Sequence, residues 1–140
     1  MNVDFVYNTD FKLNNEAETT QWINAFCKSE GFSIDSLVFA FFNDKELKDL
    51  NIKFLNHDYF TDVISFDESY DGFVKGNIAI SIDRVKENAI EFSCSFDDEL
   101  RRVIIHGVLH FMGFNDKTDD EKKKIKEKEN FAIEMFHVKR

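Results

Sequence analysis

The sequence predicts a single α+β domain in which about five helices cover a small mixed sheet of four strands. The 140 residues match the common size of one domain. Hydrophobic residues make up 43% of the chain and include 17 phenylalanines, enough for one core. Strand-like and helix-like segments follow one another in the order β-α-β-α-β-β-α-α-α, and this order favours an α+β fold over residues 1–140.

The first two elements are a strand and a helix. Residues 3–8 alternate in side-chain character, which is typical of a strand. Residues 14–31 read as a helix whose apolar side chains share one face. Asn14 or Asn15 can cap its start, and Gly31 suits the position just after its end.

The middle of the chain predicts a buried strand, a helix and two further strands. Residues 36–42 are almost all apolar. Asn43 then serves as the cap of a helix, with Glu46 at its third position. Residues 61–66 and 73–81 read as two strands joined by a turn.

Three helices complete the chain. Residues 82–93 have helical periodicity. Ser95 with Asp98, and Thr118 with Glu121, have the spacing of capping boxes that begin two more helices. The last of these helices is so rich in charge that we expect its charged residues to form a solvated face.

The helix expected at residues 97–112 is apolar on nearly every side, which indicates that it is buried. His106 and His110 nevertheless lie within it, one turn apart on the same face. A buried polar group without a partner costs about 1–3 kcal/mol, so both imidazoles need partners. Satisfied core histidines are one explanation, and a metal site is the other.

Two glycines favour the metal site. Gly107 costs roughly 1 kcal/mol inside a helix, so a close backbone approach or tight packing against the sheet must justify it. Gly113 can end the helix in a left-handed conformation, after which the chain reverses and Asp116 can return to the histidine face. We therefore predict a zincin-like metal helix with His106, His110 and Asp116 as ligands.

The expected cofactor is one zinc ion per chain. Two imidazoles and a carboxylate are ligands that zinc accepts, with water as the fourth. Another divalent metal remains open, since the same ligand set also holds non-haem iron.

Composition restricts the compartment and the partners. The net charge of −9 leaves no global basic footprint for nucleic acid, so RNA binding needs a local cluster of cations. There is no apolar run of about 18 residues, and the N-terminus lacks the features of a secretory signal. Cys27 and Cys94 stand alone, as expected in a reducing cytoplasm. We expect a cytoplasmic protein without a membrane partner.

The stretch "HGVLHFMGFND", residues 106–116, resembles the signature of the YbeY family, H-G-x-L-H-x-x-G-[YF]-[DN]-H. Residues 50–66 look like the family segment L-N-x-x-[YF]-R…T-D-V-L-S-F, and residues 75–81 look like its G-D-I-x-I-S strand. Asp116 stands where the family usually has a third histidine. Aspartate can also bind zinc, so the site is expected to persist.

The resemblance implies a metal-dependent, single-strand-directed endoribonuclease. Such an enzyme would act in maturation of the 3′ end of 16S ribosomal RNA and in ribosome quality control. The implied partners are ribosomal RNA and the ribosome or its small subunit, together with ribosomal proteins or a GTPase assembly factor.

Three positions depart from the family pattern: Leu55 replaces an arginine associated with catalysis, Asn77 replaces an acidic residue, and Asp67 replaces a proline. Loss of the arginine removes a cation that would stabilise negative charge developing on a phosphodiester. We expect cations to gather near the metal from the set Lys53, Lys75, Arg84, Lys86, Arg101 and Arg102.

Within that set, the candidate substrate-binding residues are Lys53, Lys75 and Arg102. The candidate catalytic residues are Asp62 and Ser65, although both could be ordinary strand residues.

Two other functions stay open. One is a peptidase-like metallohydrolase, which is disfavoured because Gly107 stands where the H-E-x-x-H motif places its base. The other is a non-catalytic ribosome-associated factor stabilised by metal, which the loss of the arginine at Leu55 favours.

Overall fold

The structure is a computed structural model that describes residues 2–138, and it confirms the predicted α+β fold and order of elements. The sheet has the strand order β1-β2-β4-β3, in which β1, β2 and β4 are parallel and β3 runs antiparallel to β4 at one edge. The elements in chain order are β1 (Val3–Tyr7), α1 (Glu16–Ser29), β2 (Ser33–Phe42), α2 (Asp44–Leu55), β3 (Val63–Asp67), β4 (Phe73–Ser81), α3 (Ile82–Glu91), α4 (Phe96–Phe111) and α5 (Asp119–Val138).

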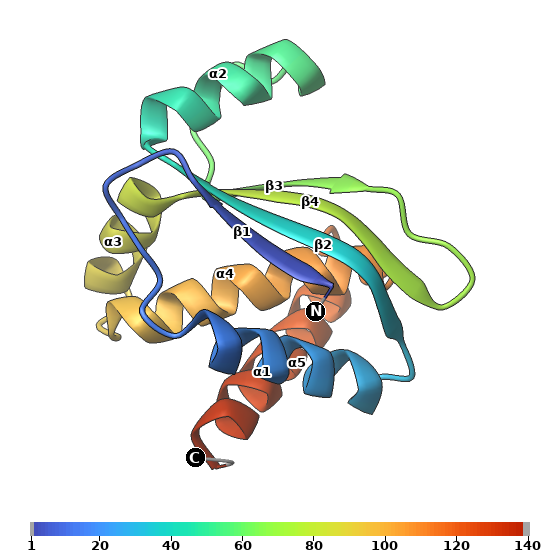
Figure 1. Ribbon diagram of the computed structural model, residues 1–140. Helices are drawn as coiled ribbons and strands as arrows, with labels where there is room; N and C mark the ends of the chain where they lie inside the picture. The colour runs from blue at the N-terminus through green and yellow to red at the C-terminus, as the bar shows by residue number, and fades with distance from the viewer. Residues whose placement is uncertain (1, 139–140) are drawn as a thin grey trace.

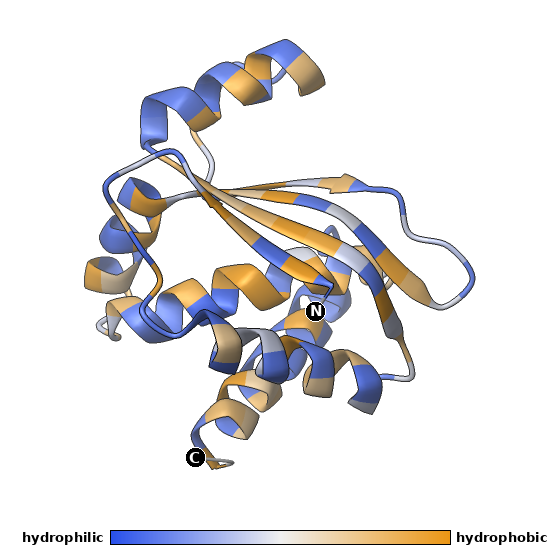
Figure 2. Ribbon diagram, viewed as in Figure 1, coloured by the Kyte–Doolittle hydropathy of each residue, from blue (hydrophilic) through white to orange (hydrophobic). Residues whose placement is uncertain are grey.

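Helices cover both faces of the sheet, but unequally. Figure 1 shows α1, α4 and α5 below the sheet, α2 above it, and α3 beside one end. The larger core lies between the sheet and the lower helices, and α4 runs through its centre. Figure 2 shows the contrast along the chain: the second half of α4 is largely hydrophobic, whereas α5 alternates between hydrophilic and hydrophobic residues.

A glycine sets how closely α4 approaches the sheet. A Cβ atom added to Gly107 would lie 3.0 Å from two side-chain carbons of Ile78 on β4 and 3.3 Å from Oγ of Ser65 on β3. Of the two reasons that the sequence allowed for this glycine, the structure therefore supports tight packing against the sheet. The close contact places His106, the preceding residue, next to the β3 edge.

The predicted helix caps form, with one exception. In the Thr118/Glu121 box, the backbone N–H of Glu121 donates to Oγ1 of Thr118 (3.1 Å), and that of Thr118 donates to Oε1 of Glu121 (3.0 Å). Asn43 and Ser95 each accept a backbone N–H three residues later. Asn15 occupies the cap position of α1, but its side-chain amide donates to Oε1 of Glu18 instead of capping the backbone.

Two strands begin at residues other than those predicted. Strand β2 begins at Ser33, three residues earlier than expected, because Ser33 pairs with Phe73 at the start of β4. Strand β3 begins at Val63, so Asp62 precedes the strand and its carbonyl accepts the backbone N–H of Ser81 at 2.9 Å.

Within residues 2–138, no helix combines the length and the apolar character needed to cross a lipid bilayer.

Gly76 on β4 yields a stability prediction. Its φ of 150° is unfavourable for other residues, and an added Cβ would lie 2.2 Å from the carbonyl oxygen of Phe66 and 2.9 Å from the ring of Phe111. We expect Gly76→Ala to lower the free energy of unfolding by at least about 2 kcal/mol, because a backbone oxygen cannot move aside. Urea unfolding followed by circular dichroism measures the change. The adjacent, exposed Asn77→Ala is the control, and equal stability of the two variants would contradict the analysis.

Candidate metal centre

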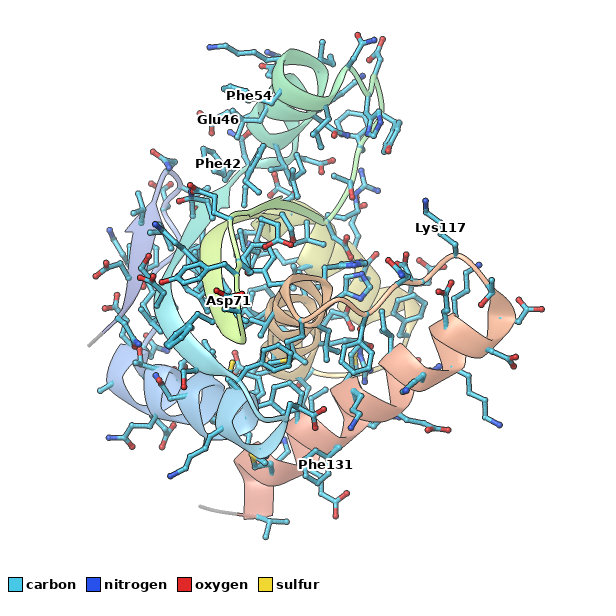
Figure 3. All side chains as sticks on the ribbon, turned by 90° about the vertical axis from the view of Figure 1, so that its right-hand side faces the viewer. Phe42, Glu46, Phe54, Asp71, Lys117 and Phe131 are labelled. Atoms are coloured by element: carbon cyan, nitrogen blue, oxygen red, sulfur yellow. The ribbon has the colours of Figure 1, made fainter. Side chains whose placement is uncertain are left out.

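The end of α4 creates the turn that the site needs. Gly113 has a φ of 94°, as predicted for a left-handed residue after the helix. The backbone N–H of Gly113 donates to the carbonyl of His110 (3.0 Å), and that of Phe114 donates to the carbonyl of Leu109 (3.1 Å). This pair of hydrogen bonds defines a Schellman motif, which reverses the chain and returns Asp116 toward α4. In Figure 3, Lys117 marks the loop that continues from this turn toward α5.

The turn brings together the three residues that the sequence predicts as metal ligands. Nε2 of His106 and Nε2 of His110 lie 3.0 Å apart. Oδ2 of Asp116 lies 3.4 Å from the first nitrogen and 3.7 Å from the second. These three atoms form the one group of potential metal ligands found within residues 2–138.

The hydrogen-bond partners of the two Nδ1 atoms fix the orientation and the tautomer of both imidazole rings. Nδ1 of His110 lies 3.0 Å from the backbone carbonyl oxygen of Phe114, which can only accept, so this nitrogen carries the proton. Nδ1 of His106 likewise donates to Oε2 of Glu129 at 2.8 Å. In their neutral forms, both rings therefore direct an Nε2 lone pair toward the same point as the Asp116 carboxylate.

This arrangement fits a divalent cation. Ligand atoms about 2.0–2.2 Å from zinc at tetrahedral angles are separated by about 3.3–3.6 Å. The observed separations of 3.0, 3.4 and 3.7 Å lie around that range. Three electron-pair donors this close together repel one another unless a cation lies between them. Asp116 is half-buried, and 43% of its side chain is accessible, so the ligand set is partly open to solvent on its side.

Glu129 of α5 is a part of the site that the sequence analysis missed. It is only 6% exposed, and its second oxygen accepts from Nη1 of Arg102 at 3.1 Å. A carboxylate that holds the other nitrogen of a metal-binding histidine fixes the orientation of the ring. A signal was present in the sequence, because Glu129 is the charged member of a helical series that otherwise consists of Ile125, Ala132 and Phe136.

The carboxylates around His106 also set its charge state. Burial lowers the pKa of His106, but the hydrogen bond and negative charge of Glu129, with further contributions from Asp116 and Asp62, outweigh burial and raise its pKa above the usual value. The site is therefore strongly attractive to positive charge, whether a proton or a metal ion.

A cavity of about 720 Å³ opens beside His106. It lies between α3, α4 and α5, and its lining includes Asp62, Asn88, Phe92, Arg102, Lys122 and Lys126. Asp62 accepts a hydrogen bond from the side-chain amide of Asn88 at 3.2 Å. Burial raises the pKa of Asp62, although the positive charge of His106 opposes the shift.

The structure brings some of the remaining predicted site residues to the cavity and leaves others away from it. Asp62 and Arg102 line the cavity. The hydroxyl of Ser65 lies beneath α4 at Gly107. Lys53 is on α2 and Lys75 is on the α2 side of β4, so both lie across the sheet from α4.

The cations that line the cavity also differ from the expected cluster. Of the six cations expected near the metal, Arg102 is the one found in the cavity lining. Lys122 and Lys126 belong to the charged stretch that the sequence analysis assigned to a solvated face, yet both line the cavity. Sequence reasoning missed them because they are two of several similar lysines on α5.

Comparisons with known proteins agree on one family. Residues 5–137 match the family described as "Endoribonuclease YbeY". The chain is 40% identical to the endoribonuclease YbeY of Flavobacterium johnsoniae over 136 residues, covering 97% of this chain and 98% of that one. It is 43% identical to that of Christiangramia forsetii, covering 97% and 95%. A solution structure of a Thermotoga maritima protein superposes with a TM-score of 0.74 at 27% identity, over 98% of this chain and 90% of that chain.

The role of Glu129 yields a prediction about metal affinity. Removing a carboxylate that orients a metal-binding histidine costs roughly 10–100-fold in affinity. We expect Glu129→Gln to weaken zinc binding by that factor, measured by competition with a chromophoric chelator. The exposed Glu127→Gln, on the same helix, removes the same charge and serves as the control. Equal affinities of the two variants would show that Glu129 does not support the site.

Proposed function

This chain belongs to the YbeY endoribonuclease family, hydrolases that act on the phosphodiester bonds of RNA, and we propose that it cuts single-stranded ribosomal RNA with the help of one zinc ion. The observation that carries the proposal is the convergence of His106, His110 and Asp116 on one point. In the cell, the proposed roles are maturation of the 3′ end of 16S ribosomal RNA and ribosome quality control. The proposed partners are ribosomal RNA and the ribosome or its small subunit, together with ribosomal proteins or a GTPase assembly factor.

A divalent cation held by His106, His110 and Asp116 would supply a Lewis acid for a phosphate oxygen and would lower the pKa of water. The protein's part is to hold the ligands in place: Glu129 fixes the ring of His106, and the carbonyl of Phe114 fixes that of His110. Both supports come from outside the helix that carries the histidines. The ligand geometry is therefore preorganised before substrate binds.

We assign the role of general base to Asp62. It lines the same cavity as His106, and burial raises the pKa of its carboxyl group. A raised pKa brings a carboxyl group closer to neutral pH, where it can accept and release a proton. The proton in question is that of the attacking hydroxyl group, either of water or of the RNA 2′ position. Ser65 is a weaker candidate, because its hydroxyl lies under α4 beside Gly107.

The structure favours a nuclease over a peptidase. The H-E-x-x-H motif places a general base beside the first histidine, and that position is Gly107 here, packed on Ile78. Glu129 cannot replace that base, because both of its oxygens are engaged by His106 and Arg102. The cavity's aromatic and lysine side chains are also the kinds of group that bind single-stranded RNA.

The alternative to the nuclease is a non-catalytic role. It is favoured by the presence of Leu55 where the family has an arginine associated with catalysis. In the structure Leu55 is the last residue of α2, on the side of the sheet away from α4. Because leucine carries no charge, the position where the family has its arginine contributes no cation to the site. If the enzyme is active, cations elsewhere must contact the substrate.

The activity prediction uses two variants and two substrates. Metal-loaded protein is expected to cut a single-stranded RNA, and His110→Ala is expected to lower the rate at least about 100-fold because one of three metal ligands is lost. Gel analysis of labelled RNA measures cleavage, and casein tested in parallel should remain intact. RNA cleavage that persists in the His106→Ala/His110→Ala double variant would refute the metal mechanism. Tight metal binding without cleavage, even with ribosomes present, would support the non-catalytic factor.

A further inference from the structure

We propose that the cavity beside the metal centre is a strand-binding cleft in which Lys122 and Lys126 of α5 contact RNA phosphates and Phe92 at the end of α3 stacks on a base. The inference rests on the proposed function only in taking RNA as the ligand. It assigns the substrate contacts to residues outside the family signature. The two lysines provide the positive charge that Leu55, in place of the family's arginine, lacks.

The lysine wall of the cleft is formed by one face of α5. Lys122 and Lys126 are four residues apart and therefore lie on the same side of the helix. Both are exposed and both line the cavity that His106 also lines. Within residues 2–138, neither ammonium group forms an ion pair, so their charge is available to an anion.

Arg102, the third cation of the cleft, is already engaged by protein carboxylates. Its Nη1 lies 3.1 Å from Glu129 and its Nε lies 3.6 Å from Glu99. Both glutamates are buried, with 6% and 2% of their surface exposed. A guanidinium held between two buried carboxylates balances their charge and has little attraction left for a phosphate. The attraction must therefore come from the two lysines.

The aromatic wall is formed by Phe92, a residue that is 61% exposed and lines the same cavity. No other aromatic ring in the described part of the chain stacks on it. The residue is held on a turn of fixed geometry, since its N–H donates to Asn88 and the next N–H, of Ser93, donates to Ile90. Stacking of a base on such a ring contributes roughly a five- to hundredfold gain in affinity and is tolerant of sequence.

The remaining charges of the cleft are compatible with an anionic strand. Four carboxylates lie in or beside its wall: Asp62, Glu99, Asp116 and Glu129. Arg102 pairs with both Glu99 and Glu129, and Asp116 belongs to the candidate metal ligands together with His106, whose Nδ1 donates to Glu129. The cleft thus combines a candidate site for a metal cation with two available lysines, within a chain whose net charge is −9. This is the local cation cluster that an acidic RNA-binding protein requires.

The lysine contacts are tested by binding to metal-loaded protein. The probe is a fluorescein-labelled, eight-nucleotide 2′-O-methyl RNA with phosphorothioate linkages, which resists cleavage, and binding is followed by anisotropy. We expect Lys122→Ala/Lys126→Ala to weaken binding at least roughly fivefold and to reduce the slope of log K against log salt by about 1.4, the value for two phosphate contacts on a single strand.

The matched control is Lys123→Ala/Lys124→Ala, which removes the same charge from the same helix outside the cleft lining. It should bind nearly as tightly as the unmodified protein. Equal weakening by the two pairs would overturn the lysine contacts, because general electrostatic attraction would then explain binding.

The stacking contact is tested by a tryptophan at position 92. The native Trp22 is only 5% exposed and gives a constant background. In Phe92→Trp, the same RNA should quench the added fluorescence, because a stacked base quenches indole. Phe54→Trp is the control, since Phe54 is 57% exposed on α2, across the sheet from the cleft, as Figure 3 shows. No quenching at position 92, or equal quenching at both positions, would overturn the stacking contact.

Conservative variants separate stacking from folding. Phe92→Tyr should keep its affinity for the probe, whereas Phe92→Leu should lose it although leucine retains apolar surface. These binding measurements are independent of turnover. RNA binding that follows these patterns without RNA cleavage would refute the proposed enzyme but not the cleft, and cleavage with unchanged binding in all cleft variants would refute only the cleft.

Discussion

The metal centre depends on the close packing of α4 against the sheet. Gly107 lets the helix lie directly on Ile78 of β4 and Ser65 of β3, at distances that leave little room for a side chain. Because α4 is buried in this position, its packing fixes the positions of His106 and His110 near its C-terminal end. A helix further from the sheet would move both rings relative to Asp62, which enters from the β3 edge.

The second constraint is the way that α5 crosses α4. One face of α5 supplies Ile125, Ala132 and Phe136 to the core, and the buried Glu129 replaces an apolar residue in that series. Burial of a carboxylate is unfavourable unless it is paired, and here His106 and Arg102 provide the pairing. The same helix thus stabilises the fold, orients a metal ligand and presents Lys122 and Lys126 to the cleft.

The uneven distribution of charge explains how a negatively charged chain can act on RNA, which is also negatively charged. The net charge of −9 would repel RNA from most of the surface. Around the cavity, however, the buried Glu99 and Glu129 are both paired with Arg102, and the exposed Lys122 and Lys126 line the opening. Repulsion elsewhere would favour a single productive orientation of the strand at the cleft.

The sequence alone determined the order of elements, most of the helix caps and the three candidate metal ligands, because each depends on short-range spacing. The pair at i and i+4, the left-handed Gly113 and the following Asp116 lie within eleven residues, so local geometry suffices to bring them together. The partners of these residues were decided by tertiary structure. Glu129 of α5 accepts from His106, Asp62 just before β3 lines the same cavity, and Lys53 and Lys75 lie on the opposite side of the sheet. Periodicity shows which face of an element is buried, but only the packing of elements shows what that face meets.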